Sequence, residues 1–208
     1  ALIGNSTKKK GLATYRELMA NVSNKTNQSG RALAKVLESW VNNMFARAAI
    51  LMSQNPYGET NIERIAETLM LEDCAKLQSL TYGYEFTAVL RLFWKASRTS
   101  DINEKMIGQE NVIRWFRGEF KTNQEAKKEL GINAIIQDEN WFDYIILWSR
   151  FFVLAGYKGF IVLIDELAYI CNTANSITRQ NNYEKILMSV KMHNPYFIYC
   201  TNMVYLVQ

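Results

Sequence analysis

The sequence predicts an α/β fold in which a large, mainly α-helical region precedes part of a parallel sheet. Three observations lead to this prediction. Five bulky apolar residues, 160–164, stand directly before two carboxylates, Asp165 and Glu166, a pattern typical of a strand buried on both faces. A second apolar run, 196–200, follows a helical pattern, which predicts a βαβ unit with parallel strands. From 11 to 156, apolar residues recur at three- and four-residue steps, which predicts helices.

The longest predicted helix begins after Gly30 and ends at the turn 55–58. Its apolar stripe consists of Leu33, Val36, Leu37, Trp40, Val41, Met44, Ala48 and Leu51. The segment 140–155 is apolar nearly all round. We therefore expect it to be a buried helix that packs against the sheet.

Polar residues and glycine predict where two further helices begin or end. Thr60 or Asn61 can cap the helix that follows, because their side chains accept hydrogen bonds from free backbone amides. Thr122 is expected to cap a short helix that Gly131 ends in the left-handed conformation.

The acids that follow the first apolar run indicate a nucleotide site. Ligands of parallel sheets bind at the carboxyl ends of the strands. In the Walker B strand of P-loop nucleoside triphosphatases, an Asp holds Mg²⁺ and a neighbouring Glu often polarises the attacking water. Asp165 is then the magnesium ligand and Glu166 the catalytic residue. The structural alternative is two solvated acids in a helix's first turn, where the macrodipole favours them.

A phosphate-binding loop is missing from the sequence. Such a loop needs GxxxxGK[ST], whose backbone amides wrap the phosphates while its lysine neutralises their charge. Residues 4–11 contain these residue types in the wrong order. The segment by itself is therefore not expected to hold ATP tightly.

Composition excludes several classes of protein. With 208 residues, 49 % of them hydrophobic, the chain can bury a substantial core. Three widely spaced cysteines (Cys74, Cys171 and Cys200) predict free thiols in the reducing cytoplasm. One histidine, His193, and no CxxC pair argue against a structural zinc site. No run of apolar residues is long enough to predict a membrane span.

The block 112–120 is rich in aromatic and basic residues. The cations in and beside it are Arg114, Arg117 and Lys121. Together with aromatic rings they could stack on and clamp nucleic acid. We favour the alternative in which Trp115 and Phe116 are core rings flanked by cations with apolar stems.

Several blocks of sequence in combination resemble a bacterial P-loop ATP-binding family, some members of which belong to BREX phage-exclusion loci. The blocks are residues 10–19, 115–120, 140–144, 156–159 with Asp165 and Glu166, and 176–187. The resemblance covers most of residues 9–190.

The resemblance implies a Walker A loop upstream of Ala1. It assigns 1–156 to the mainly helical segment between Walker A and Walker B, and 157–208 to part of the P-loop NTPase core. It implies ATP and Mg²⁺ as cofactors of the full-length protein, with Asp165 at the metal and Glu166 as the base.

The same resemblance implies roles for residues after the acidic pair. Thr201 and Asn202 occupy the place of a polar sensor that faces the γ-phosphate. The family has a Gly-Gly-Thr-Pro-like sequence there, of which this chain keeps the threonine alone. Arg179 could reach a phosphate in a neighbouring subunit, as an arginine finger does, or form a surface salt bridge.

The leading hypothesis is therefore a fragment of a cytoplasmic ATPase that uses hydrolysis to switch contacts. The partners expected are ATP, proteins of a phage-defence complex, nucleic acid and further copies of the chain in a homo-oligomer. The alternative is a non-hydrolysing, helical protein-interaction module on a degenerate NTPase core.

Overall fold

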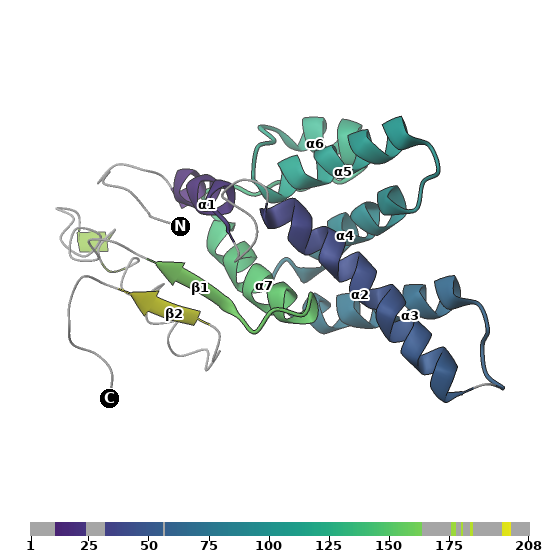
Figure 1. Ribbon diagram of the computed structural model, residues 1–208. Coiled ribbons are helices and arrows are strands. Elements are labelled where there is room, and N and C mark those ends of the chain that lie inside the picture. Colours follow the sequence, from purple (N-terminus) through teal and green to yellow (C-terminus); the bar gives the residue numbers. More distant parts are fainter. Residues whose placement is uncertain are drawn as a thin grey trace, which may run out of the picture.

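The computed structural model describes residues 11–23, 32–55, 57–163, 176–177, 180, 184 and 197–200. These residues form seven α-helices and two short strands (Figure 1). The helices are α1 (Gly11–Ala20), α2 (Ala32–Gln54), α3 (Ile62–Gln78), α4 (Gly83–Ser97), α5 (Ile102–Phe116), α6 (Asn123–Leu130) and α7 (Trp141–Leu154). The strands are β1 (Phe160–Leu163) and β2 (Phe197–Cys200).

The prediction of an α/β fold with a partial P-loop NTPase-type parallel sheet is wrong. Helices build the part of the chain that the structure describes, and its strands are limited to β1 and β2. These two pair in parallel at one end of the helical body (Figure 1). A continuous apolar run indicates that a segment is buried, but it does not say how many strands lie beside it. The division into 1–156 and 157–208 stays a prediction.

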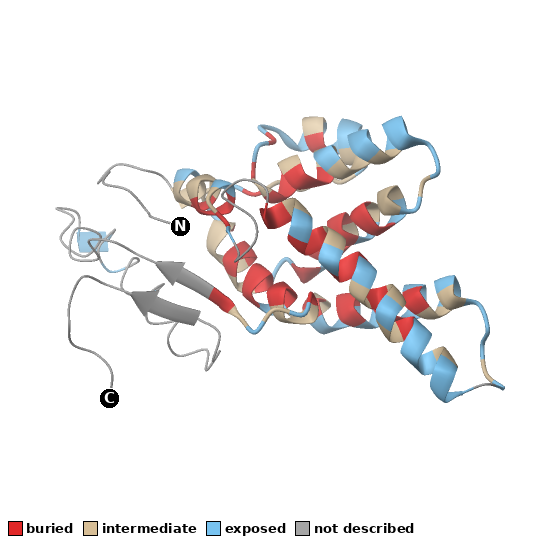
Figure 2. Ribbon diagram, viewed as in Figure 1, coloured by how far each residue is buried: buried red, intermediate tan, exposed pale blue. Residues whose placement is uncertain are grey.

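The core lies between the helices, whose buried residues face one another (Figure 2). The large aromatic side chains of α2, α4, α5 and α7 meet there. The centroid of the Phe86 ring lies 5.3 Å from that of Trp148 and 5.0 Å from that of Phe116. The ring centroids of Trp40 and Phe151 are 5.3 Å apart. Burial of such large rings contributes strongly to stability.

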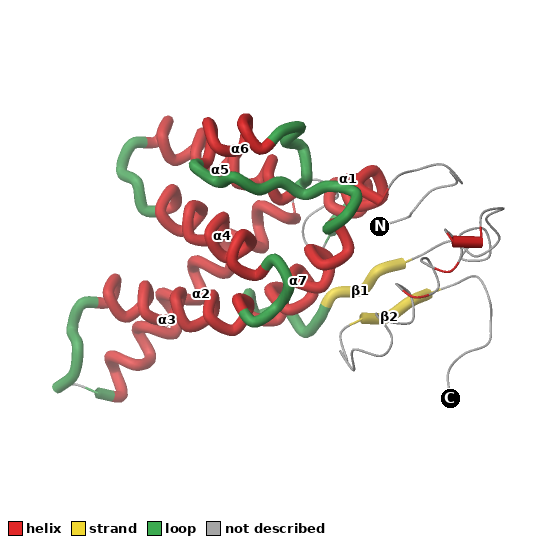
Figure 3. The backbone as a smooth tube through the Cα atoms, turned by 180° about the vertical axis from the view of Figure 1, so that it is seen from behind, coloured by secondary structure: helices red, strands yellow, loops and turns green. Residues whose placement is uncertain are grey.

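The helix α7 is buried, as its composition predicts. Seven of its residues are buried: Tyr144, Ile145, Leu147, Trp148, Ser149, Phe151 and Phe152. The helices α1, α3 and α4 pack on it, and α7 lies between α3 and the strands (Figure 3). Its Phe152 ring also contacts Phe160 of β1, so other helices cover most of α7 and the strand covers a part.

The predicted caps are confirmed. The Asn61 side chain accepts hydrogen bonds from the amides of Glu63 and Arg64, so Asn61, and not Thr60, begins α3. The Thr122 side chain accepts one from the Glu125 amide at the start of α6. Gly131 ends α6 in the left-handed conformation, with φ 71°.

The apolar stripe of α2 is buried along most of its length. From Leu33 to Ala48, all its predicted members are buried. Leu51 is an exception with 44 % exposure, because the last turns of α2 extend beyond the helices that cover the rest (Figure 1).

Candidate functional site

The residues predicted to form the nucleotide site lie outside the described residues. They are Asp165, Glu166, Arg179, Thr201 and Asn202. Their predicted roles are therefore not tested by the structure. In the part of the chain that it does describe, no three His, Cys, Asp or Glu side chains are placed to hold a metal ion.

The strand that leads into the acidic pair is described. β1 pairs in parallel with β2, and Leu163 and Cys200 form the last pair of the register. Both strands therefore end on the same side of the ladder. The helix α1 lies near that end in two opposite views (Figures 1 and 3).

Aromatic packing attaches β1 to the helical body. The ring centroid of Phe152 in α7 lies 4.7 Å from that of Phe160, the first residue of β1, and 6.2 Å from that of Tyr157. Between them the chain turns at Gly156, with φ 92°, and the Tyr157 amide donates to the Phe152 carbonyl at 2.9 Å. Because the side chain of Phe152 is buried, β1 starts from a packed and hydrogen-bonded base.

A buried hydroxyl attaches α1 to the same body. The Tyr15 hydroxyl donates to the Phe116 carbonyl at 2.7 Å and accepts from the Trp148 indole at 3.0 Å. Burial raises the pKa of Tyr15 above its ordinary value, so the hydroxyl stays neutral and keeps its proton for the carbonyl. At the N-terminus of α1, the Leu12 amide donates to the Asp138 carboxylate at 2.8 Å. These contacts connect segments more than one hundred residues apart, and no pattern in the sequence indicates them.

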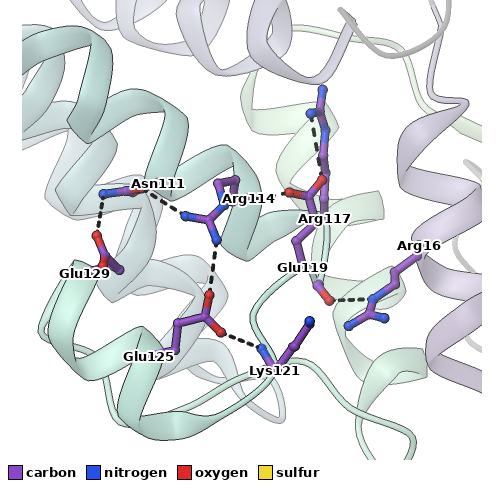
Figure 4. Close-up of polar contacts among 9 residues, drawn as sticks. Arg16, Asn111, Arg114, Arg117, Glu119, Lys121, Glu125 and Glu129 are labelled. Atoms are coloured by element: carbon purple, nitrogen blue, oxygen red, sulfur yellow. Dashed lines mark hydrogen bonds and ion pairs between the residues drawn. The ribbon is translucent and has the colours of Figure 1, made fainter. Parts of the chain in front are cut away.

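The aromatic and basic block has the structural role that we favoured. Trp115, Phe116 and Phe120 are at most 2 % exposed, so their rings are not free to stack on bases. The Arg114 guanidinium pairs with Glu125 at 3.1 Å (Figure 4). Its central carbon also lies 4.8 Å from the centroid of the Phe120 ring.

A carboxylate of the same chain also neutralises Arg117. Arg117 pairs with Glu119, with an N–O distance of 3.9 Å (Figure 4). From α1, Arg16 donates to the Gly118 carbonyl at 2.6 Å. The network therefore holds the corner between α5 and α6 against α1. We do not propose this block as a nucleic-acid site.

A buried carboxylate that the sequence analysis missed joins α2 to α3. Asp73 accepts hydrogen bonds from the Trp40 indole at 3.3 Å, from Arg47 at 3.2 Å and from Lys76 at 3.0 Å. Its side chain is 2 % exposed. Two cations and an indole compensate the burial of its charge, which gives Asp73 a structural role. An acid on the apolar stripe of a helix was the signal that could have identified it.

The thiol of Cys74 is free, as predicted for that residue. Burial raises its pKa to about 12, although Arg91 acts to lower it. The nucleophilic form of cysteine is the thiolate. Cys74 is therefore a core residue and not a catalytic one. Cys171 and the side chain of Cys200 lie outside the described residues.

Comparison with known proteins supplies the identity of the chain. The family described as BREX system ATP-binding protein BrxC/D matches residues 4–198. The chain belongs to this family. Neither a curated protein nor a solved structure matches the chain. The resemblance predicted from the sequence is therefore confirmed, and with it a BREX-related role in phage defence and ATP as the ligand of the family. In the described part, none of the helices combines the length and apolarity needed to cross a bilayer.

Proposed function

We propose that this BrxC/D family protein hydrolyses the ATP that it binds, and that Asp165 and Glu166 carry the acidic functions of that reaction. The observation that carries the proposal is the membership in an ATP-binding family combined with the two acids that follow β1 in the sequence.

Chain connectivity supports a shared location for these residues. Asp165 is two residues beyond Leu163, so their Cα atoms are no more than about 7 Å apart. Thr201 directly follows Cys200, which pairs with Leu163. Both segments therefore start from the same end of the ladder, where polar groups from two strands can serve one ligand.

The proposed roles follow from the chemistry of the side chains. Carboxylate oxygens are ligands that Mg²⁺ prefers, which suits Asp165. A carboxylate next to it can orient the attacking water and accept its proton, which suits Glu166. We assign Thr201 and Asn202 to the γ-phosphate, and Arg179 to a phosphate in a neighbouring subunit of a homo-oligomer. The magnesium ion, when bound, neutralises charge on the phosphates.

The Glu166→Gln variant of the full-length protein tests the catalytic role. The amide keeps the size of the side chain but cannot accept the proton. We expect ATP binding to persist and the turnover rate to fall by about 100-fold or more. The measurement is steady-state phosphate release beside equilibrium binding of ATP. An unchanged turnover rate would exclude Glu166 as the base.

The Asp165→Ala variant tests the metal role separately. Loss of the carboxylate should weaken ATP binding in the presence of Mg²⁺ and leave binding in EDTA unchanged. Calorimetric titration with and without Mg²⁺ measures this difference. Equal affinity of the wild type under both conditions would argue against a magnesium ligand at this position.

One observation favours a second function, a helical interaction module that does not hydrolyse ATP. In the described ranges of residues 11–155, helices are the regular elements and supply most of the core residues. In the leading proposal, hydrolysis switches contacts of this helical body with proteins of a defence complex or with nucleic acid. In the second, the contacts are constant. The second function is favoured if the protein captures the same partner to the same extent with ATP and with ADP, and if the Glu166→Gln variant does so as well.

A further inference from the structure

A strained residue lies at the turn between α3 and α4. Tyr82 has φ 58°, and in the described part it is the one residue other than glycine with a positive φ. A bulky side chain rarely adopts this conformation, because its Cβ approaches a carbonyl oxygen. The Tyr82 ring stacks on the ring of Tyr144 from α7, with centroids 5.6 Å apart and an interplanar angle of 24°. Figures 1 and 3 both show the turn beside α7.

Tyr144, the residue on whose ring Tyr82 stacks, has a hydroxyl group without a hydrogen-bond partner in the described part of the chain. Tyr144 is fully buried, and its hydroxyl oxygen has no hydrogen-bond partner within the part of the chain that the structure describes. Buried polar groups almost always have partners, so each exception requires an explanation. Burial raises the pKa of Tyr144, and the nearby charge of Glu85 raises it further. The hydroxyl is therefore neutral, and its oxygen is available as an acceptor.

A carboxylate without a counterion lies at the same place. Glu85 is half-buried in the first turn of α4, and among the described residues no cation or hydrogen-bond donor pairs with it. The helix dipole favours a negative charge there but does not saturate the carboxylate oxygens. Beside it, Tyr84 is 70 % exposed. We name these four residues, Tyr82, Tyr84, Glu85 and Tyr144, the α3–α4 corner.

We propose that the α3–α4 corner is a docking site for an arginine side chain of a partner protein. Aromatic faces attract a cation that lies over them. The carboxylate of Glu85 matches the planar fork of a guanidinium group. One of the remaining N–H groups of the guanidinium can donate to the Tyr144 hydroxyl oxygen once the Tyr82 ring moves aside.

Charge complementarity decides the kind of partner. Glu85 and Asp143 both act on Tyr144 with negative charge, so an anionic ligand would be repelled. A purely apolar ligand would leave the carboxylate and the hydroxyl without partners. A cation satisfies both groups. The site differs from the proposed nucleotide site, so its test is independent of ATP hydrolysis.

The test is binding of a fluorescein-labelled peptide that contains arginine between glycine and serine residues, measured by fluorescence anisotropy on the full-length protein. The comparison peptide carries citrulline, which has the shape of arginine without its charge. We expect the arginine peptide to bind and the citrulline peptide to bind much more weakly. The Glu85→Gln variant should weaken the arginine peptide by about fivefold or more.

Glu104→Gln is the matched control variant. Glu104 occupies the same position in the first turn of α5 as Glu85 does in α4, but it is exposed and has no tyrosine pair beside it. We expect it to leave the affinity unchanged. Tyr144→Phe, which removes only the hydroxyl, should also weaken binding while the protein stays folded.

Three results would overturn the proposal. The first is no binding of the arginine peptide. The second is an equal loss of affinity in Glu85→Gln and Glu104→Gln, which would show unspecific attraction to negative charge. The third is binding that appears only after Lys8, Lys9 and Lys10 are changed to glutamine, since a segment of the same chain would then be the occupant.

Discussion

Two neighbouring helices of equal length, α4 and α5, begin in opposite ways. At the start of α5, the Asp101 side chain accepts hydrogen bonds from the amides of Asn103 at 2.7 Å and Glu104 at 3.0 Å. At the start of α4, Tyr82 has a left-handed backbone and makes no side-chain capping hydrogen bond. Local chemistry therefore determines where α5 begins. The start of α4 depends on the packing of Tyr82 on Tyr144 and of Gly83 on α3.

Gly83→Ala should break the start of α4 and cause the largest effect. A Cβ there would lie 2.1 Å from the Leu77 carbonyl oxygen and 2.9 Å from the Gln78 Cα, both backbone atoms that cannot move aside. We expect the free energy of unfolding to fall by about 3 kcal/mol. Urea unfolding followed by tryptophan fluorescence measures the change.

The control for this variant is Gly131→Ala, at the end of α6. Gly131 has a positive φ, but apart from its chain neighbours no described residue has an atom within 4 Å of the position where its Cβ would be. Only the left-handed penalty of about 1 kcal/mol applies there. If both variants lose the same stability, close packing does not determine the start of α4.

Asp101→Ala removes the local signal that begins α5. Two amides lose their acceptor, so the free energy of unfolding should fall by about 1 kcal/mol. Asp101→Asn keeps a side-chain oxygen and should retain most of the stability. Denaturation of the two variants side by side provides the measurement. A loss in Asp101→Asn as large as in Asp101→Ala would show that the negative charge, and not the acceptor, stabilises α5.

Tyr144→Phe changes the residue on which Tyr82 packs before α4 and has the smallest expected effect. The hydroxyl is buried without a partner in the described part, so its removal should raise the free energy of unfolding by up to about 1 kcal/mol. The matched variant is Tyr15→Phe, which should destabilise because the Tyr15 hydroxyl makes two buried hydrogen bonds. Thermal unfolding of both variants gives the signs. A destabilised Tyr144→Phe would mean that the hydroxyl has a partner in the folded protein.

The sequence predicted features that depend on neighbours in the chain. Asn61, Thr122 and Gly131 were predicted as helix ends and are confirmed, since capping involves atoms within a few residues. The burial of Trp115 and Phe116 followed from helical spacing and is confirmed as well. The family resemblance, carried by blocks spread over the chain, is also confirmed.

The fold class could not be predicted in the same way. The apolar run at β1 was interpreted as one strand of a larger sheet, whereas helices build the described part. Likewise, Leu51 continues the apolar stripe of α2 in the sequence, but it is exposed because it lies beyond the helices that cover the rest of the stripe. An apolar pattern reports what a segment can bury and not which segment covers it.

From the sequence we predicted the helical character of residues 11–156, several helix ends, part of the core and the family, because period and capping act over a few residues. Three contacts depend on how the helices pack: Asp73 joins α2 to α3, Tyr15 attaches α1 to α5 and α7, and the Tyr82 ring stacks on Tyr144. The hydrogen bonds among them link residues between 26 and 133 positions apart, and the ring pair joins the turn before α4 to α7. Their energy comes from burial and hydrogen bonding that exist only once the helices have packed.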